Sequence, residues 1–180
     1  LCTLAQGLWL LLELWLGGAL AWPLVFRLLP ALWEALGPWG LLAAAPVLTF
    51  LGFLAGSALA LAGTLLAKRL LIGRYRAGQH PVWGGFYLRH WLVQRFARLL
   101  PWELLGQTAF LAPLLRALGA RVGHRLRVQR GVDLRRAAWD LLELGDDVVL
   151  CQEAAPRTLS LEGGMLRIGP VVIGSGACLD

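Results

Sequence analysis

The first third of this sequence has almost no charge. Between residues 1 and 67 the only charged side chains are Glu13, Arg27 and Glu34. The whole chain of 180 residues is 58% hydrophobic, with a mean hydropathy of +0.64, whereas soluble domains are nearer half apolar. This lack of charge excludes an ordinary soluble fold for the segment and predicts that it lies in a membrane.

Cysteine is also scarce. Cys2, Cys151 and Cys178 are far apart in the sequence, and no CxxC pair exists. The spacing gives no support to zinc or thioredoxin-like chemistry, and no metal-ligand pattern or phosphate loop is visible. We therefore expect no metal and no cofactor in this segment, and we expect the three thiols to be small buried side chains in a reducing compartment.

Two stretches near the N-terminus are long enough to cross a bilayer. Residues 39–67 contain no charged side chain and exceed the roughly 20 apolar residues that a membrane-spanning helix needs. Residues 4–26 form a second stretch, interrupted by Glu13, and residues 27–38 are expected to form a short loop between the two. The sequence predicts a hairpin of two transmembrane helices within residues 1–67.

Positive charge begins abruptly at Lys68. From there to residue 136 the chain carries fourteen basic residues, and the net charge of the whole chain is +6. The positive-inside rule places this side of the membrane in the cytoplasm. We expect a multi-pass protein of the cell membrane with a cytoplasmic soluble part and the lipid bilayer as a partner. Nucleic acid is not an expected partner, because no recognised binding motif accompanies the charge.

Residues 68–118 are predicted to form a basic juxtamembrane and interfacial helical segment. Apolar residues recur at helical spacing between residues 86 and 100, and His90 falls on the opposite, polar side. The apolar positions are Leu88, Leu92, Phe96 and Leu99. Such a helix can lie in the head-group plane of a membrane. The alternative is a soluble helix packed on the domain behind it.

A different repeat begins at Gly119. Three times, an aliphatic residue followed by Gly is followed by a small or aliphatic residue four positions on and an aliphatic residue six positions on. These repeats start at Val122-Gly123, Leu144-Gly145 and Ile173-Gly174. The rhythm is typical of hexapeptide-repeat β-helices. We expect residues 119–180 to begin a left-handed parallel β-helix, incomplete within this chain; the alternative is a small β-domain with glycine turns. Asp146-Asp147 and Gly163-Gly164 are interpreted as turn residues.

The order of several motifs resembles the C-terminal membrane region of epsilon-poly-lysine-synthetase-like nonribosomal peptide synthetases. The motifs are LAKRLLIGRYR at residues 66–76, PVW at 81–83, YLRHWL at 87–92, LRALGARVG at 115–123, DLLELGDD at 140–147 and IGPVVIGSGA at 168–177. The sequence begins at Leu1 rather than Met and stops at Asp180 within the repeat pattern, so we expect it to be a fragment of a longer polypeptide. The resemblance implies hexapeptide-repeat acyltransferase-like segments behind helix pairs.

The resemblance further implies an activity and partners. The reaction would be acyl transfer to an amine, which joins amino-acyl units through amide bonds without a metal or bound cofactor. The acyl donor would be presented on an upstream carrier domain. Upstream adenylation and carrier domains of the same chain, and other helix pairs of the full protein, are the partners that it implies.

Amide formation needs a base that deprotonates the incoming amine. Hexapeptide acyltransferases commonly use a His in a coil loop, and this chain has His80, His90 and His124. His124 follows the first repeat glycine, and Asp140 could orient a partner, so these two are the candidate catalytic residues. Related chains carry a His near the position of Leu159, where this chain has none. That departure leaves the catalytic role of this copy open.

Three classes of function follow from these observations. The first is an acyltransferase-like module of a membrane-bound peptide synthetase. The second is a membrane-associated hexapeptide-repeat O-acyltransferase that acts on sugars or lipids. The third is a noncatalytic scaffold that holds the synthetase at the membrane.

Overall fold

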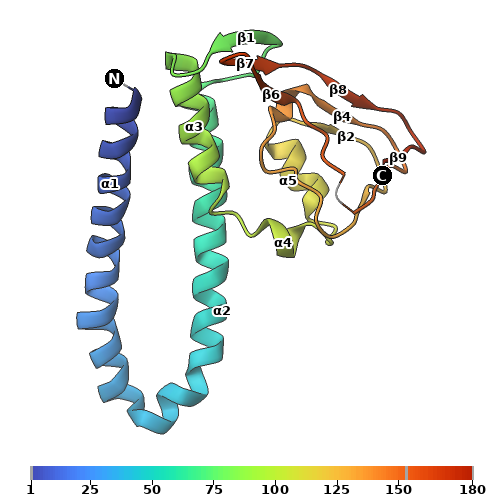
Figure 1. The fold of residues 1–180 in the computed structure, drawn as a ribbon. Helices are drawn as coiled ribbons and strands as arrows, with labels where there is room; N and C mark the ends of the chain where they lie inside the picture. Colours follow the sequence, from blue (N-terminus) through green and yellow to red (C-terminus); the bar gives the residue numbers. More distant parts are fainter. Residues whose placement is uncertain (1, 153, 180) are drawn as a thin grey trace. The chain divides into compact units, whose positions relative to one another are not determined.

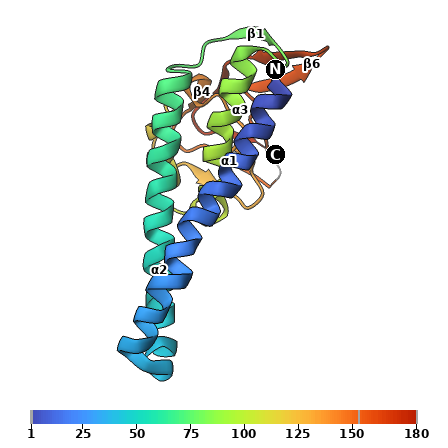
Figure 2. The ribbon, with the colours of Figure 1, turned by 90° about the vertical axis from the view of Figure 1, so that its left-hand side faces the viewer.

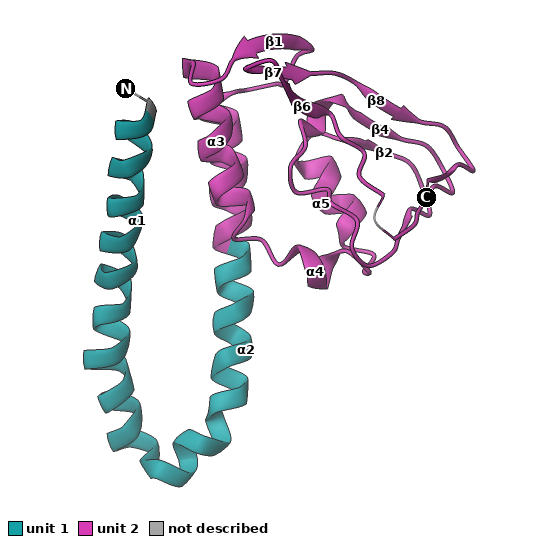
Figure 3. Ribbon diagram, viewed as in Figure 1, with its two compact units in different colours: residues 1–58 teal, residues 59–180 magenta. Residues whose placement is uncertain are grey.

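The chain divides into two compact units (Figure 3). The structure is a computed structural model that describes residues 2–152 and 154–179. Unit 1 is Leu1–Ala58 and unit 2 is Leu59–Asp180. The boundary lies within a helix, and the change of charge at Lys68 therefore falls inside unit 2. The predicted division at residues 67 and 118 rests on composition alone and stays a prediction.

Unit 1 is helical throughout its described residues. α1 spans Cys2–Pro23, the π-helix η1 spans Leu24–Leu28, and α2 (Leu29–Leu71) begins in unit 1 and ends in unit 2. The expected loop at residues 27–38 is therefore wrong, because this segment is helical apart from Gly37 (φ 65, ψ 177). Gly tolerates this φ at no steric cost. A helical connection also satisfies the backbone groups internally, as an apolar environment requires.

The helical stretch Thr3–Leu71 is long and apolar enough to cross a membrane, by length and composition. Its large apolar side chains are mostly exposed, and Trp39 is the extreme at 82%. Large exposed apolar surfaces mark sites that contact a membrane or another protein. Two separate spans and a cytoplasmic orientation stay predictions.

Unit 2 starts with the end of α2, against which α3 (Gly85–Ala97) lies (Figure 2). Gly63 permits the close approach, because a Cβ there would lie 3.3 Å from the Phe96 ring. α3 buries His90, Val93 and Ala97. The predicted apolar face is therefore wrong in register, since His90 was placed on the polar side. Burial of this face in the protein core agrees with a soluble helix packed on its own domain.

Two short helices follow, and they lead into the core of unit 2. α4 spans Trp102–Leu105 and α5 spans Leu111–Ala117, which packs against the first strand of the repeats. The largest fully buried side chain is that of Trp139, in the 3₁₀ helix η2 (Trp139–Leu141). Its indole N–H donates to the Leu134 carbonyl at 3.1 Å, as a buried indole requires.

The three sequence repeats form two small parallel sheets (Figure 1). One sheet has the order β2 (Arg121–Val122), β4 (Leu142–Leu144), β8 (Val171–Ile173), and the other β3 (Arg127–Val128), β5 (Val149–Leu150), β9 (Cys178–Leu179). The aliphatic residue that starts each repeat is in register with the others: Val122 with Leu144 and Ile173. Stacking of successive repeats buries their aliphatic side chains together. The complete left-handed coil stays a prediction.

A third sheet is antiparallel, with the order β1 (Gly78–Pro81), β7 (Met165–Ile168), β6 (Leu159–Glu162). The β6–β7 hairpin turns through Gly163 (φ 56) and Gly164 (φ 74). Two positive φ values in a two-residue hairpin are typical of a type I′ turn, which favours Gly-Gly. The prediction that these glycines form a turn is confirmed.

Candidate functional site

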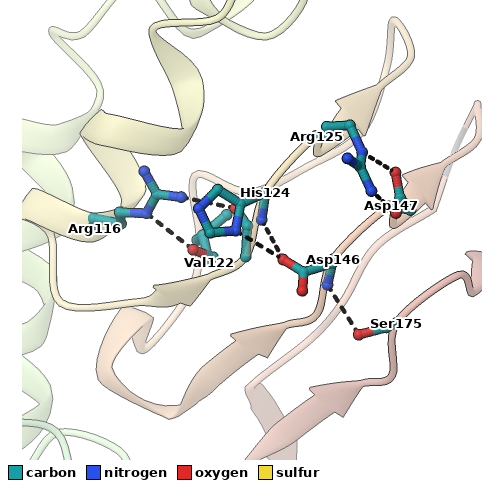
Figure 4. A network of polar contacts seen from close by, with 8 residues as sticks. Arg116, Val122, His124, Arg125, Asp146, Asp147 and Ser175 are labelled. Atoms are coloured by element: carbon teal, nitrogen blue, oxygen red, sulfur yellow. Dashed lines mark hydrogen bonds and ion pairs between the residues drawn. The ribbon is translucent and has the colours of Figure 1, made fainter.

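Each repeat carries a turn just after its glycine, and the three turns are built alike. The second turn residue has a positive φ in every case: 57 at Arg125, 55 at Asp147 and 72 at Gly176. The prediction that Asp146-Asp147 forms a turn is confirmed. Because the strands on either side are in parallel register, the turns lie one above the other (Figure 4).

A ladder of hydrogen bonds connects these turns. The backbone N–H of His124 donates to Asp146 Oδ1 at 2.6 Å, and the backbone N–H of Asp146 donates to Ser175 Oγ at 3.1 Å (Figure 4). Each turn thus supplies the acceptor that the preceding turn needs. On the other side of the first turn, Arg116 of α5 donates to the carbonyl oxygens of Val122 and Gly123, at 2.9 and 2.7 Å. The backbone of the first turn is therefore held from both directions.

Close stacking of the turns depends on glycine. A Cβ at Gly123 would lie 2.6 Å from Asp146 Oδ1, and a Cβ at Gly145 would lie 2.6 Å from the backbone N of Ser175. A methyl group at Gly123 would displace the Asp146 carboxylate, and one at Gly145 would displace the backbone of Ser175. The glycines of the first two repeats, Gly123 and Gly145, therefore set the spacing that lets the ladder form.

The ladder places a carboxylate against the His124 ring. Asp146 Oδ1 lies 3.1 Å from His124 Nδ1, while the His124 side chain is 85% exposed. Two hydrogen bonds hold the pKa of Asp146 below its usual value. The larger effect comes from the His124 backbone N–H and the smaller from the His124 side chain. An ionised carboxylate at Nδ1 fixes the ring orientation and leaves Nε2 free to exchange a proton with a substrate.

A second ion pair occupies the same turns. The Arg125 guanidinium bonds both carboxylate oxygens of Asp147 in a fork. The hydrogen bond from Arg125 lowers the pKa of Asp147, and the same bond raises the pKa of Arg125. Both side chains are exposed, so the pair contributes little stability. The Arg125–Asp147 pair lies next to the His124–Asp146 pair in the same turns, but it contains no imidazole that could act as a base.

Asp140 lies elsewhere, in a buried ion pair. Lys68 Nζ is 2.8 Å from Asp140 Oδ1, the backbone N–H of Tyr75 donates to Oδ2 at 3.0 Å, and the two charged side chains are only 9% and 13% exposed. Gly119 (φ +100) gives the pair its room, because a Cβ there would fall 2.2 Å from Oδ1. Asp140 therefore does not orient a histidine. It holds the end of α2 against the repeats, beside a cavity of about 590 Å³ that Arg74 also lines.

The other two histidines are packed against aromatic rings. His90 Nδ1 lies 2.9 Å from the Tyr75 hydroxyl. Burial lowers the pKa of His90 to about 4 and raises the pKa of Tyr75, so both are neutral at pH 7 and form a core contact. His80 in β1 stacks on Phe86, with the ring centres 4.0 Å apart. Neither ring is placed like that of His124, with a carboxylate on one nitrogen and solvent at the other.

The expectation of buried thiols is wrong for two of the three cysteines. Cys178 is exposed and Cys151 is partly exposed. Their Sγ atoms lie 3.2 Å apart, because β5 and β9 are neighbours in one sheet. The side chain of Cys2 lies outside the described part of the structure. Within residues 2–152 and 154–179, no group of three His, Cys, Asp or Glu side chains could hold a metal ion.

Sequence reasoning named His124 but missed its partner. The repeat alignment that puts Val122 in register with Leu144 also puts His124 in register with Asp146, so the signal was present. The Lys68–Asp140 pair had no such signal, because 72 residues separate the two.

A comparison with known proteins finds similarity to a peptide synthetase. The alignment is 123 residues long and covers 65% of the chain, which is 32% identical over this length to the delta-poly-L-ornithine synthetase of Acinetobacter baumannii. The chain is similar to part of a peptide synthetase. The match spans 9% of the length of that protein, and it supports a relationship to a peptide-synthetase family. No protein-family model matches the chain, and no solved structure matches it.

Proposed function

We propose that this chain is an acyltransferase-like module of a membrane-bound nonribosomal peptide synthetase. The module would transfer an amino-acyl group to an amine and so join units through amide bonds. The similarity to a poly-ornithine synthetase supports this reaction class. In this proposal the apolar helices anchor the module in the membrane, and the two parallel sheets belong to the beginning of a left-handed β-helix.

The proposed reaction needs one proton acceptor near the amine. The amine nitrogen attacks the acyl carbon, a C–N bond forms, and the bond from that carbon to its carrier breaks. His124 Nε2 takes the proton from the amine and passes it to the departing carrier group. The acyl donor would be presented on an upstream carrier domain, so the chain itself needs no bound cofactor.

The His124–Asp146 pair is the observation that carries this proposal. Asp146 accepts a hydrogen bond from the His124 backbone N–H and lies 3.1 Å from Nδ1. This contact holds one ring nitrogen in place and leaves the other, Nε2, toward solvent. A general base must reach the proton that it removes, and the exposure of His124 makes Nε2 accessible to an amine carried on a mobile arm. Asp146 acts as the positioning residue.

The test uses the full-length synthetase in its membrane. Polymer yield would be measured by mass spectrometry, and loading of the amino acid onto the protein would be measured in the same samples. His124→Gln removes the base, while Asp146→Asn keeps an oxygen for the His124 backbone and loses the charge. We expect normal loading in both variants, with yield lowered about 100-fold in His124→Gln and less in Asp146→Asn.

A matched control is available in the same turns. Arg125→Gln and Asp147→Asn break the neighbouring exposed ion pair and leave His124 in place, so both should keep wild-type yield. Wild-type yield from His124→Gln would refute the assignment and favour the noncatalytic scaffold. If His124→Gln lost acyl transfer to hydroxyl groups while transfer to amines was unchanged, the O-acyltransferase would be favoured.

A further inference from the structure

A second cavity, of about 770 Å³, lies between the end of α3, α4 and the loop after β3. Gln94 and Arg98 line it from the end of α3, and Arg130, Arg135 and Arg136 line it from the loop. Its volume is that of a typical small-molecule site. None of its lining residues belongs to the His124–Asp146 pair or to the Lys68–Asp140 pair.

The cavity carries surplus positive charge. Four arginines line it against two carboxylates, those of Glu103 and Asp133. Both carboxylates are engaged by Arg135: its guanidinium donates to Glu103 at 3.2 Å, and its backbone N–H donates to Asp133 at 3.1 Å. Of these four arginines, Arg98, Arg130 and Arg136 have no ion-pair partner among residues 2–152 and 154–179.

A buried donor at the same cavity also lacks its partner. Gln94 Nε2 is shielded from solvent and makes no hydrogen bond with the described residues. Leaving a buried amide N–H without an acceptor costs free energy, so such groups are usually paired. Next to three unpaired guanidinium groups, the group that best satisfies the amide is an oxygen with negative charge.

One wall of the cavity is rigid and apolar. The Trp102 indole N–H donates to the Ala97 carbonyl at 2.7 Å, and its ring stacks on that of Trp139 at 6.5 Å with an interplanar angle of 9°. Leu111 and Leu134 are almost fully buried beside it. A ligand that fits this cavity therefore combines an oxyanion with an apolar part.

We infer that this cavity binds a ligand that carries a phosphate group. Guanidinium groups present a fork of donors that matches the oxygens of a phosphate, and Gln94 supplies one more donor from within. The apolar part of the ligand lies against Trp102. Two sources can supply this chemistry, a soluble phosphate compound or a phospholipid head group, and the experiment separates them.

The experiment uses the full-length protein held in an amphipathic polymer without free detergent, in a buffer free of phosphate. Phenylglyoxal modifies accessible arginines, and mass spectrometry gives the extent of modification at each site. Inorganic phosphate is the first probe, and vesicles of phosphatidylglycerol, compared with vesicles of phosphatidylcholine, are the second. We expect protection of Arg98, Arg130 and Arg136. Arg89, exposed on the same helix α3, should be modified at an unchanged rate.

Variants make the inference specific. Arg136→Gln and Gln94→Leu should each raise the concentration that gives half-protection of Arg98 by roughly tenfold, since each removes one donor to an anion. Arg89→Gln, the matched control, should leave it unchanged. Arg136 is exposed, so Arg136→Gln keeps the inference testable if Gln94→Leu does not fold.

Each outcome decides a point. Protection by inorganic phosphate supports a soluble phosphate ligand. Protection by phosphatidylglycerol vesicles alone, absent with phosphatidylcholine, supports a lipid head group. Protection by neither probe, or equal protection of Arg89, would overturn the inference. These results do not depend on amide formation, so they stand apart from the test of His124.

Discussion

Separating Lys68 from Asp140 should loosen the junction between α2 and the repeats. Both side chains are nearly buried and lie 2.8 Å apart. Lys68→Met leaves a buried carboxylate with the Tyr75 N–H as its remaining donor, and Asp140→Asn leaves a buried ammonium unpaired. Breaking a buried pair from one side costs about 3 to 5 kcal/mol. The double variant Lys68→Met/Asp140→Asn leaves no charge and keeps an oxygen for Tyr75, so it should cost less than either single change.

The magnitude can be measured locally by hydrogen exchange and mass spectrometry of the full-length protein. A loss of about 3 kcal/mol lowers the protection of the affected amides by roughly 100-fold. Peptides that cover residues 70–76 and 139–150 should show it in both single variants, and partial recovery should follow in the double variant. Arg121→Gln is the control, because Arg121 pairs with Glu143 at 78% and 40% exposure and such pairs are worth about 1 kcal/mol or less.

Wild-type protection in both single variants would show that the pair does not hold this junction. The same conclusion would follow if the double variant lost as much protection as the two single variants together. In that case the charges would act independently, and the buried pair would not be what holds these segments together.

Three further predictions concern other parts of unit 2. The folded pKa of His90 is about 4, below its usual 6.5, so the unfolded chain takes up the proton first as the pH falls. Stability should therefore drop by about 2 kcal/mol between pH 7 and pH 5, and His90→Gln should remove much of this dependence in denaturant titrations. Gly145→Ala should destabilise by about 1 to 3 kcal/mol, because a Cβ there would lie 2.6 Å from the backbone N of Ser175. Mild oxidation should join Cys151 to Cys178, whose Sγ atoms are 3.2 Å apart; peptide mass spectra without reduction should show the disulfide, and Cys178→Ser should abolish it.

The stacking of the repeats could be predicted from the sequence, because it rests on local patterns. The spacing from Val122 to Leu144 and Ile173 anticipated which residues share a register. Turn residues followed from their chemistry, since Gly163-Gly164 suits a tight hairpin. These features depend on few neighbours, and those neighbours are near in sequence or repeat at a fixed interval.

The parts that failed depend on distant partners. His90 was placed on a polar face because imidazole is polar, but Tyr75 gives it a hydrogen bond in the core. Asp140 was expected to orient a partner without that partner being named, and the structure pairs it with Lys68, which is 72 residues away. The segment at residues 27–38 was expected to be a loop because it lies between the two apolar stretches, and only Gly37 departs from helical geometry there. No local pattern carries this information.

The most direct measurement is a single turnover of the full-length synthetase. The protein is loaded with a labelled amino acid, an amine acceptor is added, and the amide product is followed in time alongside the remaining loaded protein. If His124 is the base, His124→Gln should stay loaded and form amide about 100-fold more slowly, while Arg125→Gln should match the wild type. Amide formation at the wild-type rate in His124→Gln would contradict this role of His124.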